Sequence, residues 1–251
     1  MTKTFMARAA AVLGGLLLSF SALAAAPPGG IMQSGTDLGD KASLQRGAKL
    51  FMNYCSGCHS LQHLRYSRMA EDLGLTEEEV MENLNFTGAA FGDHIISAMP
   101  ADQAADWFGV APPDLSLTVR SKLGGPDWVY TFLMSFYQDD ASALGWNNTW
   151  FPDVSMPNVL WELQGLQRPV IGEADPESGQ ATIERLEIAQ PGTQNPEEFQ
   201  RSVRDITAFL EYAAEPAALK RNSIGVWVLV FLVFFTLLTW LLKQEYWRDV
   251  K

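Results

Sequence analysis

The sequence has 251 residues, of which 47% are hydrophobic and 19% charged, and its formal net charge is −11. This length suits one folded domain with appendages, and the apolar content excludes a wholly disordered chain. Phosphate contacts are made mainly by Lys and Arg, so we expect no nucleic-acid partner for so acidic a chain, whereas basic partners are favoured. Two cysteines are too few for a disulfide scaffold.

The amino-terminal segment, residues 1–26, is typical of an export signal. Lys3 and Arg8 give it a basic start, an uncharged apolar run follows, and small residues up to Ala26 offer cleavage sites. An uncleaved anchor helix is the alternative interpretation. An export signal places the body of the chain, residues 27–220, outside the cytoplasm.

A second apolar run near the carboxyl end, Ile224 to Leu242, contains no charge. As a helix it would be about 28 Å long, close to the thickness of a bilayer core. Trp227 and Trp240 lie near its ends, as aromatic residues do at membrane interfaces. We therefore predict one transmembrane helix over residues 221–243 and a short cytoplasmic tail over residues 244–251.

The body between these segments is expected to be mainly α, with long loops. Apolar spacing, capping boxes and proline at first helical positions indicate the helices, and weak alternation indicates one hairpin. The expected elements are helices over 44–54, 77–84, 126–137 and 196–214, a long loop over 138–158 and a hairpin within 169–193.

Cys55, Cys58 and His59 form the pattern C-x-x-C-H, which is the attachment signature of c-type haem. Two thiols at this spacing can reach the two vinyl groups of one porphyrin, and the adjacent imidazole can face the iron. A disulfide would leave His59 without a role, and a structural zinc site needs a second ligand pair. A thioredoxin-like pair needs a strand before it, whereas the sequence before Cys55 is helical. One covalent haem c, with its iron, is therefore the predicted cofactor.

An electron-carrying haem usually takes a sixth ligand, and methionine opposite histidine holds its potential high. Met99 and Met156 each precede a proline, which keeps the methionine backbone extended in a loop. Periodicity does not choose between them. His63 follows His59 too closely to reach the opposite face, and His94 is a surface residue by default.

Basic and acidic side chains supply further candidates. Arg120 and Lys122 could bind the haem propionates, although solvated surface charge explains them equally well. An acidic cluster could attract a basic acceptor, and a merely solvated face is again the alternative. The cluster consists of Glu71, Asp72, Glu77, Glu78 and Glu79.

Taken in order, several motifs resemble the cytochrome c1 family, the haem subunit of ubiquinol–cytochrome c reductase. The resemblance covers essentially the whole mature chain and ends directly before the single membrane helix. The motifs are Arg46 to His59, Ala111 to Ser116, Gly124 to Tyr130, Met156 to Leu160, and Asp205 to Pro216.

The resemblance implies a class I cytochrome c-like haem domain with loop insertions. By resemblance, Cys55 and Cys58 hold the haem, His59 is the proximal ligand and Met156 is the distal ligand. Lys122 stands where the family often has arginine, so Arg120 is a second candidate for a propionate contact.

The resemblance also implies an electron-transfer subunit rather than a catalyst alone. Its partners would be cytochrome b, the Rieske iron–sulfur subunit and a soluble basic cytochrome c, in a dimeric complex of the inner membrane. The haem domain would then lie in the periplasm. The rival hypotheses are a membrane-anchored monohaem cytochrome c serving another terminal oxidase or reductase, a haem enzyme or gas sensor with an open sixth position, and a non-haem structural protein.

Overall fold

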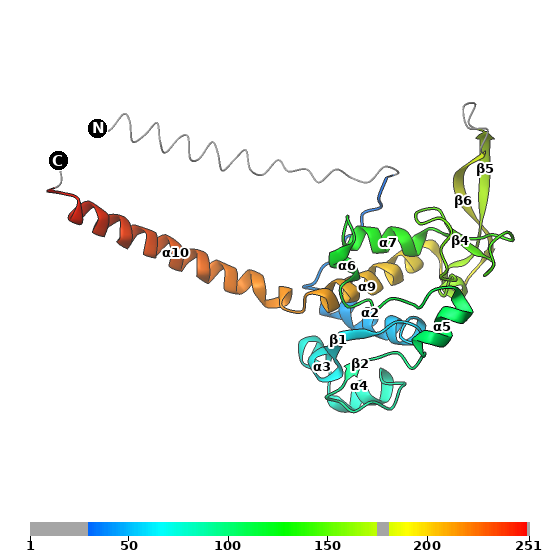
Figure 1. The fold of residues 1–251 in the computed structure, drawn as a ribbon, viewed down its shortest axis with the longest axis horizontal. Coiled ribbons are helices and arrows are strands. Elements are labelled where there is room, and N and C mark those ends of the chain that lie inside the picture. Colours follow the sequence, from blue (N-terminus) through cyan, green and yellow to red (C-terminus); the bar gives the residue numbers. More distant parts are fainter. Residues whose placement is uncertain (1–29, 175–180, 250–251) are drawn as a thin grey trace. The chain divides into compact units, whose positions relative to one another are not determined.

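The structure, a computed structural model, describes residues 30–174 and 181–249 (Figure 1). The export signal predicted over residues 1–26 lies outside the described residues. The helices are α2 (Lys41–Tyr54), α3 (Tyr66–Leu73), α4 (Glu77–Asn83), α5 (Ala101–Phe108), α6 (Thr118–Ser121), α7 (Pro126–Met134), α8 (Trp161–Gln164), α9 (Pro196–Ala214) and α10 (Ala218–Tyr246). The strands are β1 (Leu61–Arg65), β2 (His94–Ile95), β3 (Phe136–Gln138), β4 (Trp146–Asn148), β5 (Gly165–Ala174) and β6 (Ala181–Pro191).

The mainly α fold class is confirmed, and the strands form separate antiparallel pairs, β1 with β2, β3 with β4 and β5 with β6. The predicted hairpin is the β5–β6 pair. The helix predicted over 126–137 ends earlier, at Met134, because the chain turns at Ser135 into strand β3. The long loop predicted over 138–158 contains the short strand β4.

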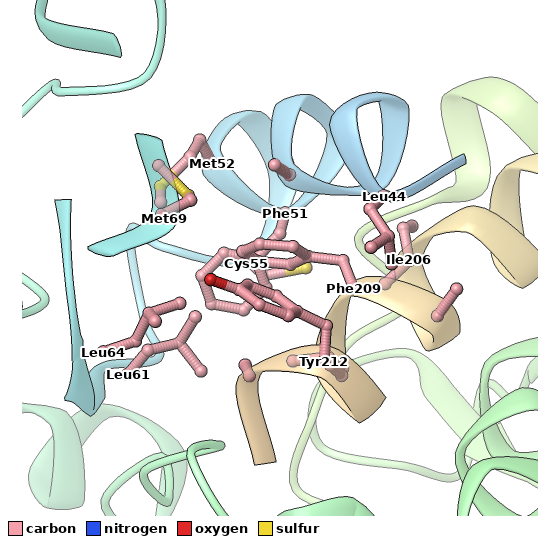
Figure 2. Close-up of a cluster of buried hydrophobic side chains, with 14 of the residues drawn as sticks. Leu44, Phe51, Met52, Cys55, Leu61, Leu64, Met69, Ile206, Phe209 and Tyr212 are labelled. Carbon is pink, nitrogen blue, oxygen red and sulfur yellow. The ribbon is translucent and has the colours of Figure 1, made fainter. Parts of the chain in front are cut away.

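Helices α2 and α9 pack against each other and form the centre of the core (Figure 1). Gly47 makes this close approach possible, because a Cβ atom there would collide with the Asp205 carbonyl group. The Phe51 and Phe209 rings then meet with their centroids 5.6 Å apart. Figure 2 shows these rings within the buried cluster that also contains Cys55. The core therefore lies directly beside the C-x-x-C-H segment.

A buried carboxylate joins the same two helices. Asp205 on α9 is 3% exposed, and its Oδ1 accepts a hydrogen bond of 2.6 Å from the Ser43 hydroxyl on α2. Arg46, also on α2, donates to the same carboxylate through Nε at 2.6 Å. These bonds satisfy the buried charge, which would otherwise be costly.

A second buried carboxylate joins α3 to α9. Asp72 accepts a hydrogen bond of 3.1 Å from the Tyr212 hydroxyl and pairs with Arg68. Burial is the main reason that the pKa of Tyr212 is raised, so this phenol remains a donor at physiological pH.

The segment before α2 is bound to the body through specific hydrogen bonds. The Ser34 hydroxyl donates to Asp127 Oδ1 of α7 at 2.6 Å, and the Met32 amide donates to the Thr131 hydroxyl at 2.9 Å. Arg204 of α9 donates to the Ser34 carbonyl at 2.8 Å. The polypeptide from Met32 onward is therefore held against the body before helix α2 begins.

From Ile224 to Leu242, helix α10 is apolar on all sides, and its Leu, Val and Phe side chains there are exposed. Its segment Ile224–Tyr246 is the one helix among the described residues that is long and apolar enough to cross a membrane. The anchor predicted at this end of the chain therefore corresponds to a single continuous helix, which begins a few residues earlier, at Ala218.

Candidate functional site

The Cys55–His59 segment is a tight turn at the end of α2. Cys55 is the C-cap residue, and the amides of Cys58 and His59 donate to its carbonyl at 3.0 and 2.8 Å. These bonds hold the two thiols and the imidazole within one turn. Both cysteines are free thiols rather than a disulfide, so both are available to form thioethers.

Burial controls the chemistry of the two thiols. Cys55 is 8% exposed, and burial raises the pKa of its thiol to about 12. The pKa of Cys58 is also raised by burial, although this residue is more exposed. Both side chains are therefore neutral, protonated thiols at physiological pH.

His59 is positioned by a backbone carbonyl. Its Nδ1 lies 2.7 Å from the oxygen of Pro113, and because a carbonyl only accepts, Nδ1 carries the proton. Nε2 then keeps its lone pair for a metal. Burial lowers the pKa of His59 and favours the neutral ring, the form in which an imidazole can bind a metal.

The segment that carries Pro113 is itself fastened beside the turn. The Leu115 amide donates to the Ser60 carbonyl at 2.9 Å, and Asp114 accepts from the Gln62 amide at 2.8 Å. This explains physically why the Ala-Pro-Pro-Asp motif accompanies the C-x-x-C-H motif. The sequence contains both motifs, but it gives no signal that a proline carbonyl orients the histidine.

The two methionine candidates lie in differently supported segments. Met156 is half-buried and lies two residues before Asn158, whose buried side chain accepts from the Leu160 amide at 3.0 Å. Met99 is also half-buried, and its amide donates to Ser97 Oγ, which in turn donates to the Gly57 carbonyl. Both loops are therefore ordered, and both thioethers remain candidates on geometry.

The two basic candidates make different contacts. Lys122 Nζ lies 4.5 Å from the Trp128 ring centroid and 5.7 Å from that of Phe151, which are cation–π distances. Arg120 Nη1 lies 3.6 Å from Oε2 of Glu215. Both basic side chains are exposed. Although only one residue lies between them in the sequence, Lys122 and Arg120 therefore contact different groups in the structure.

The remaining polar candidates do not assemble into another centre. His63 is exposed, and half-buried His94 lies in β2 with its Nδ1 unpartnered. No group of three or more His, Cys, Asp or Glu side chains suited to a metal ion occurs in the described part of the chain. The donors that do gather, two free thiols and one neutral imidazole, fit a c-type haem.

The predicted acidic cluster needs one correction. Asp72 is 9% exposed and binds Tyr212 and Arg68, so it is not part of a surface for partners. Its position on the inner side of α3 was not apparent from the charge run alone. The other four members, Glu71, Glu77, Glu78 and Glu79, are exposed. Glu79 also completes the capping box with Thr76.

Comparison with known proteins decides the family. The sequence model of the Cytochrome C1 family matches residues 33–166 and 190–250. The chain belongs to the cytochrome c1 family. The family model leaves residues 167–189 unmatched, and the described part of this stretch lies in strands β5 and β6.

Individual relatives agree with this assignment. The chain is 51% identical to cytochrome c1 of Allochromatium vinosum over 236 residues, which cover 94% of this chain and 96% of the relative. It is 44% identical to a protein named ammonia monooxygenase gamma subunit of Nitrosomonas europaea over 85% of this chain and 86% of that one. Cytochrome c1 of Rhodospirillum rubrum is 28% identical over 99% of both chains.

Membership of the cytochrome c1 family makes the chain a haem-carrying electron-transfer subunit of the bc1 complex. Its cofactor is a covalent c-type haem, which contains iron, and the apolar helix α10 anchors the chain in a membrane. The predicted family and cofactor are confirmed. The individual haem-binding residues remain predictions.

Proposed function

We propose that this chain accepts electrons from the Rieske iron–sulfur subunit and passes them to a soluble cytochrome c. The haem is held by Cys55 and Cys58 and is ligated by His59 and Met156. The observation that carries this proposal is the 2.7 Å contact between His59 Nδ1 and the Pro113 carbonyl, because it leaves Nε2 free to bind iron. The two adjacent free thiols support the same assignment.

Each protein group has a distinct task in this mechanism. The bound haem supplies a one-electron iron couple, and no substrate bond is made or broken by the chain. Cys55 and Cys58 would hold the haem covalently as thioethers, each formed by addition of one S–H group across a vinyl group. Pro113 fixes the orientation of the His59 ring, and the Met156 thioether, as the second iron ligand, would favour ferrous iron and raise the potential.

The haem propionates need positive or hydrogen-bonding partners, and Lys122 and Arg120 are the candidates. Lys122 precedes α7, and its ammonium lies over the Trp128 ring. Among the described residues, no ion pair joins Lys122 to a carboxylate. Arg120 already faces Glu215. These contacts favour Lys122 as the propionate partner.

The domain order that we propose follows the direction of export. Residues 1–26 are the signal, residues 27–220 form a periplasmic haem domain, residues 221–243 span the inner membrane, and residues 244–251 are cytoplasmic. In this orientation the haem domain meets cytochrome b and the Rieske subunit at the outer face of the membrane, in a complex that is dimeric.

Substitution of the axial ligand tests the proposed haem site. Met156→Ala should lower the midpoint potential strongly, give a high-spin ferric spectrum and open the iron to carbon monoxide, whereas Met99→Ala should change none of these. The reverse result would move the distal ligand to Met99. A pyridine haemochrome spectrum of each variant measures whether the haem is still attached.

Co-purification separates the proposed electron path from the rival one. A complex containing b-type haem and the Rieske subunit is expected to purify with this chain. Isolation with another terminal oxidase or reductase instead would contradict the proposed partners while leaving the haem site intact.

Electrostatic steering of a basic acceptor is tested by ionic strength. Glu77 and Glu78 are exposed on α4 and add to the negative charge of the chain. Oxidation by a basic cytochrome c should slow as salt rises, and the Glu77→Gln/Glu78→Gln variant should be less sensitive to salt. Glu184→Gln on the hairpin is the matched control. A flat response in the unaltered complex would contradict steering.

A further inference from the structure

The connection between the haem domain and the membrane anchor is very short. Helix α9 ends at Ala214 and α10 begins at Ala218, so only residues 215–217 join them. Pro216 has no amide hydrogen and cannot continue the hydrogen bonds of α9. Any change in the direction of the anchor relative to the domain is therefore concentrated at these residues.

Glu215, at the start of this connection, faces two arginines from different elements. Arg221 of α10 donates through Nη1 to Oε1 at 2.6 Å. Nη1 of Arg120, in α6, lies 3.6 Å from the other oxygen, Oε2. One carboxylate thus bridges an element of the haem domain and the first turns of the anchor helix.

Both ends of this bridge are fixed by their local structure. Val119, next to Arg120, is 5% exposed, and Tyr212 and Ala213, just before Glu215, are buried in the core. On the anchor side, the Arg221 amide is bonded to the Ala217 carbonyl at 3.0 Å. The two arginines are therefore presented by ordered backbone rather than by free loops.

The arrangement is a network of three charges rather than a single surface pair. An isolated exposed ion pair contributes little to stability, whereas a network of several charges is the recognised exception. Here a carboxylate whose side chain is 31% exposed is shared by two cations. Glu215 also lies just before the amino terminus of α10, where negative charge is stabilised by the helix dipole.

We propose that Arg120, Glu215 and Arg221 form an ionic clasp that restricts the motion of the membrane anchor relative to the haem domain. Arg120 then serves as a positioning residue of this clasp rather than as a propionate ligand. The clasp limits the range of positions from which the haem domain can meet its partners. This inference depends on the membrane anchoring of the chain and not on the proposed electron path.

Distance measurements between the two parts test the clasp in the intact, membrane-embedded complex. Spin labels are introduced at Glu82→Cys on α4 and Gln244→Cys at the far end of α10, both exposed in the chain. The native cysteines carry the haem thioethers and are not labelled, and the haem is kept ferrous and low-spin. The distance distribution is then recorded for Glu215→Gln, Arg120→Gln and Arg221→Gln, with Arg185→Gln of the hairpin as the matched control.

The three clasp variants should each broaden the distance distribution, and Arg185→Gln should leave it unchanged. An unchanged width in Glu215→Gln overturns the proposal. A shift of the haem midpoint potential in Arg120→Gln, with the width unchanged, also overturns it, because Arg120 would then belong to the haem. Raising the ionic strength needs no variant and should broaden the distribution of the unaltered complex through screening; a distribution that does not respond to salt contradicts the clasp.

Discussion

Helices α9 and α10 are consecutive in the chain, yet they are built for different surroundings. In α9, one face buries Val203, Ile206 and Phe209 in the core, while charged residues cover the other face. In α10, apolar side chains are exposed on every side. Two helices separated by only three residues are therefore stabilised by different surroundings. Packing in a protein core stabilises α9, and contact with lipid stabilises α10.

Polar side chains make the same distinction. On α9, Asp205 binds Ser43 and Arg46 of another helix, so its polar group fixes tertiary structure. On α10, the Thr236 hydroxyl donates to the Leu232 carbonyl of the same helix at 2.7 Å. A polar group that is satisfied within its own helix imposes no partner, which is what a lipid environment requires.

Substitution at the contact between α2 and α9 should reduce the stability of the domain more than any other change considered below. Gly47→Ala places a methyl group against the Asp205 carbonyl and should cost about 3 kcal/mol or more of stability. Gly225→Ala in α10 is the matched control, because its added Cβ meets nothing within 4 Å. Denaturant unfolding followed by haem absorbance measures both. Equal stability of the two variants would show that the close contact between α2 and α9 does not determine the stability of the domain.

A charge in α10 should affect the membrane and spare the core. Val233, which is 71% exposed, lies in the apolar span, and Val233→Lys should weaken membrane insertion by about 3 kcal/mol. The domain should keep its haem. The measurement is the fraction of haem-stained chain recovered with membranes, with Val233→Leu as control. Loss of attached haem in the lysine variant would mean that the two regions do not fold independently.

Removal of the buried carboxylate has a smaller expected effect. Asp205→Ala leaves the Ser43 hydroxyl and the Arg46 guanidinium without their shared acceptor and should cost about 2 kcal/mol. Thr236→Val in α10 removes only a bond within its helix and should be nearly neutral. Unfolding midpoints compare the two. If the threonine variant lost as much stability as the aspartate variant, the proposed contrast between the helices would fail.

Removal of the helix cap at the amino terminus of α9 should reduce stability only slightly. Asn195 accepts from the Glu198 amide in a capping box, and Asn195→Ala should cost about 1 kcal/mol. Gln200→Ala, at an exposed position of the same helix, is the control and should be neutral. Thermal unfolding of the solubilised complex distinguishes them; a neutral Asn195 variant would indicate that tertiary packing alone starts this helix.

Local chemistry made some elements of the fold predictable. The capping boxes at Thr76 and Asn195 form as their sequences indicate, and the apolar run near the carboxyl end forms one helix. The early end of α7 was not predictable. Beyond it, the buried side chain of Gln167 donates to the Phe136 carbonyl at 2.8 Å, and such contacts between distant segments leave no periodic pattern.

The candidate site was predictable to a similar extent. The types and spacing of Cys55, Cys58 and His59 identify the cofactor chemistry, because covalent haem attachment needs that pattern. The contribution of Pro113 was not predictable, since a backbone carbonyl can be supplied by any residue. The burial of Asp72 was likewise hidden, because a charge run does not reveal which carboxylate faces the core.

The hydrogen bond between Ser43 and Asp205 has a consequence for biogenesis, because the two residues are 162 positions apart. At roughly 5–20 residues per second of synthesis, α2 and the turn with the two thiols wait about 10–30 s for α9 to emerge. During this interval Cys55 lacks the α9 side chains of its buried cluster, among them Phe209 and Tyr212 (Figure 2). If the two thiols hold the haem as proposed, the order of the helices along the chain would leave them accessible before α9 arrives and bury Cys55 afterwards.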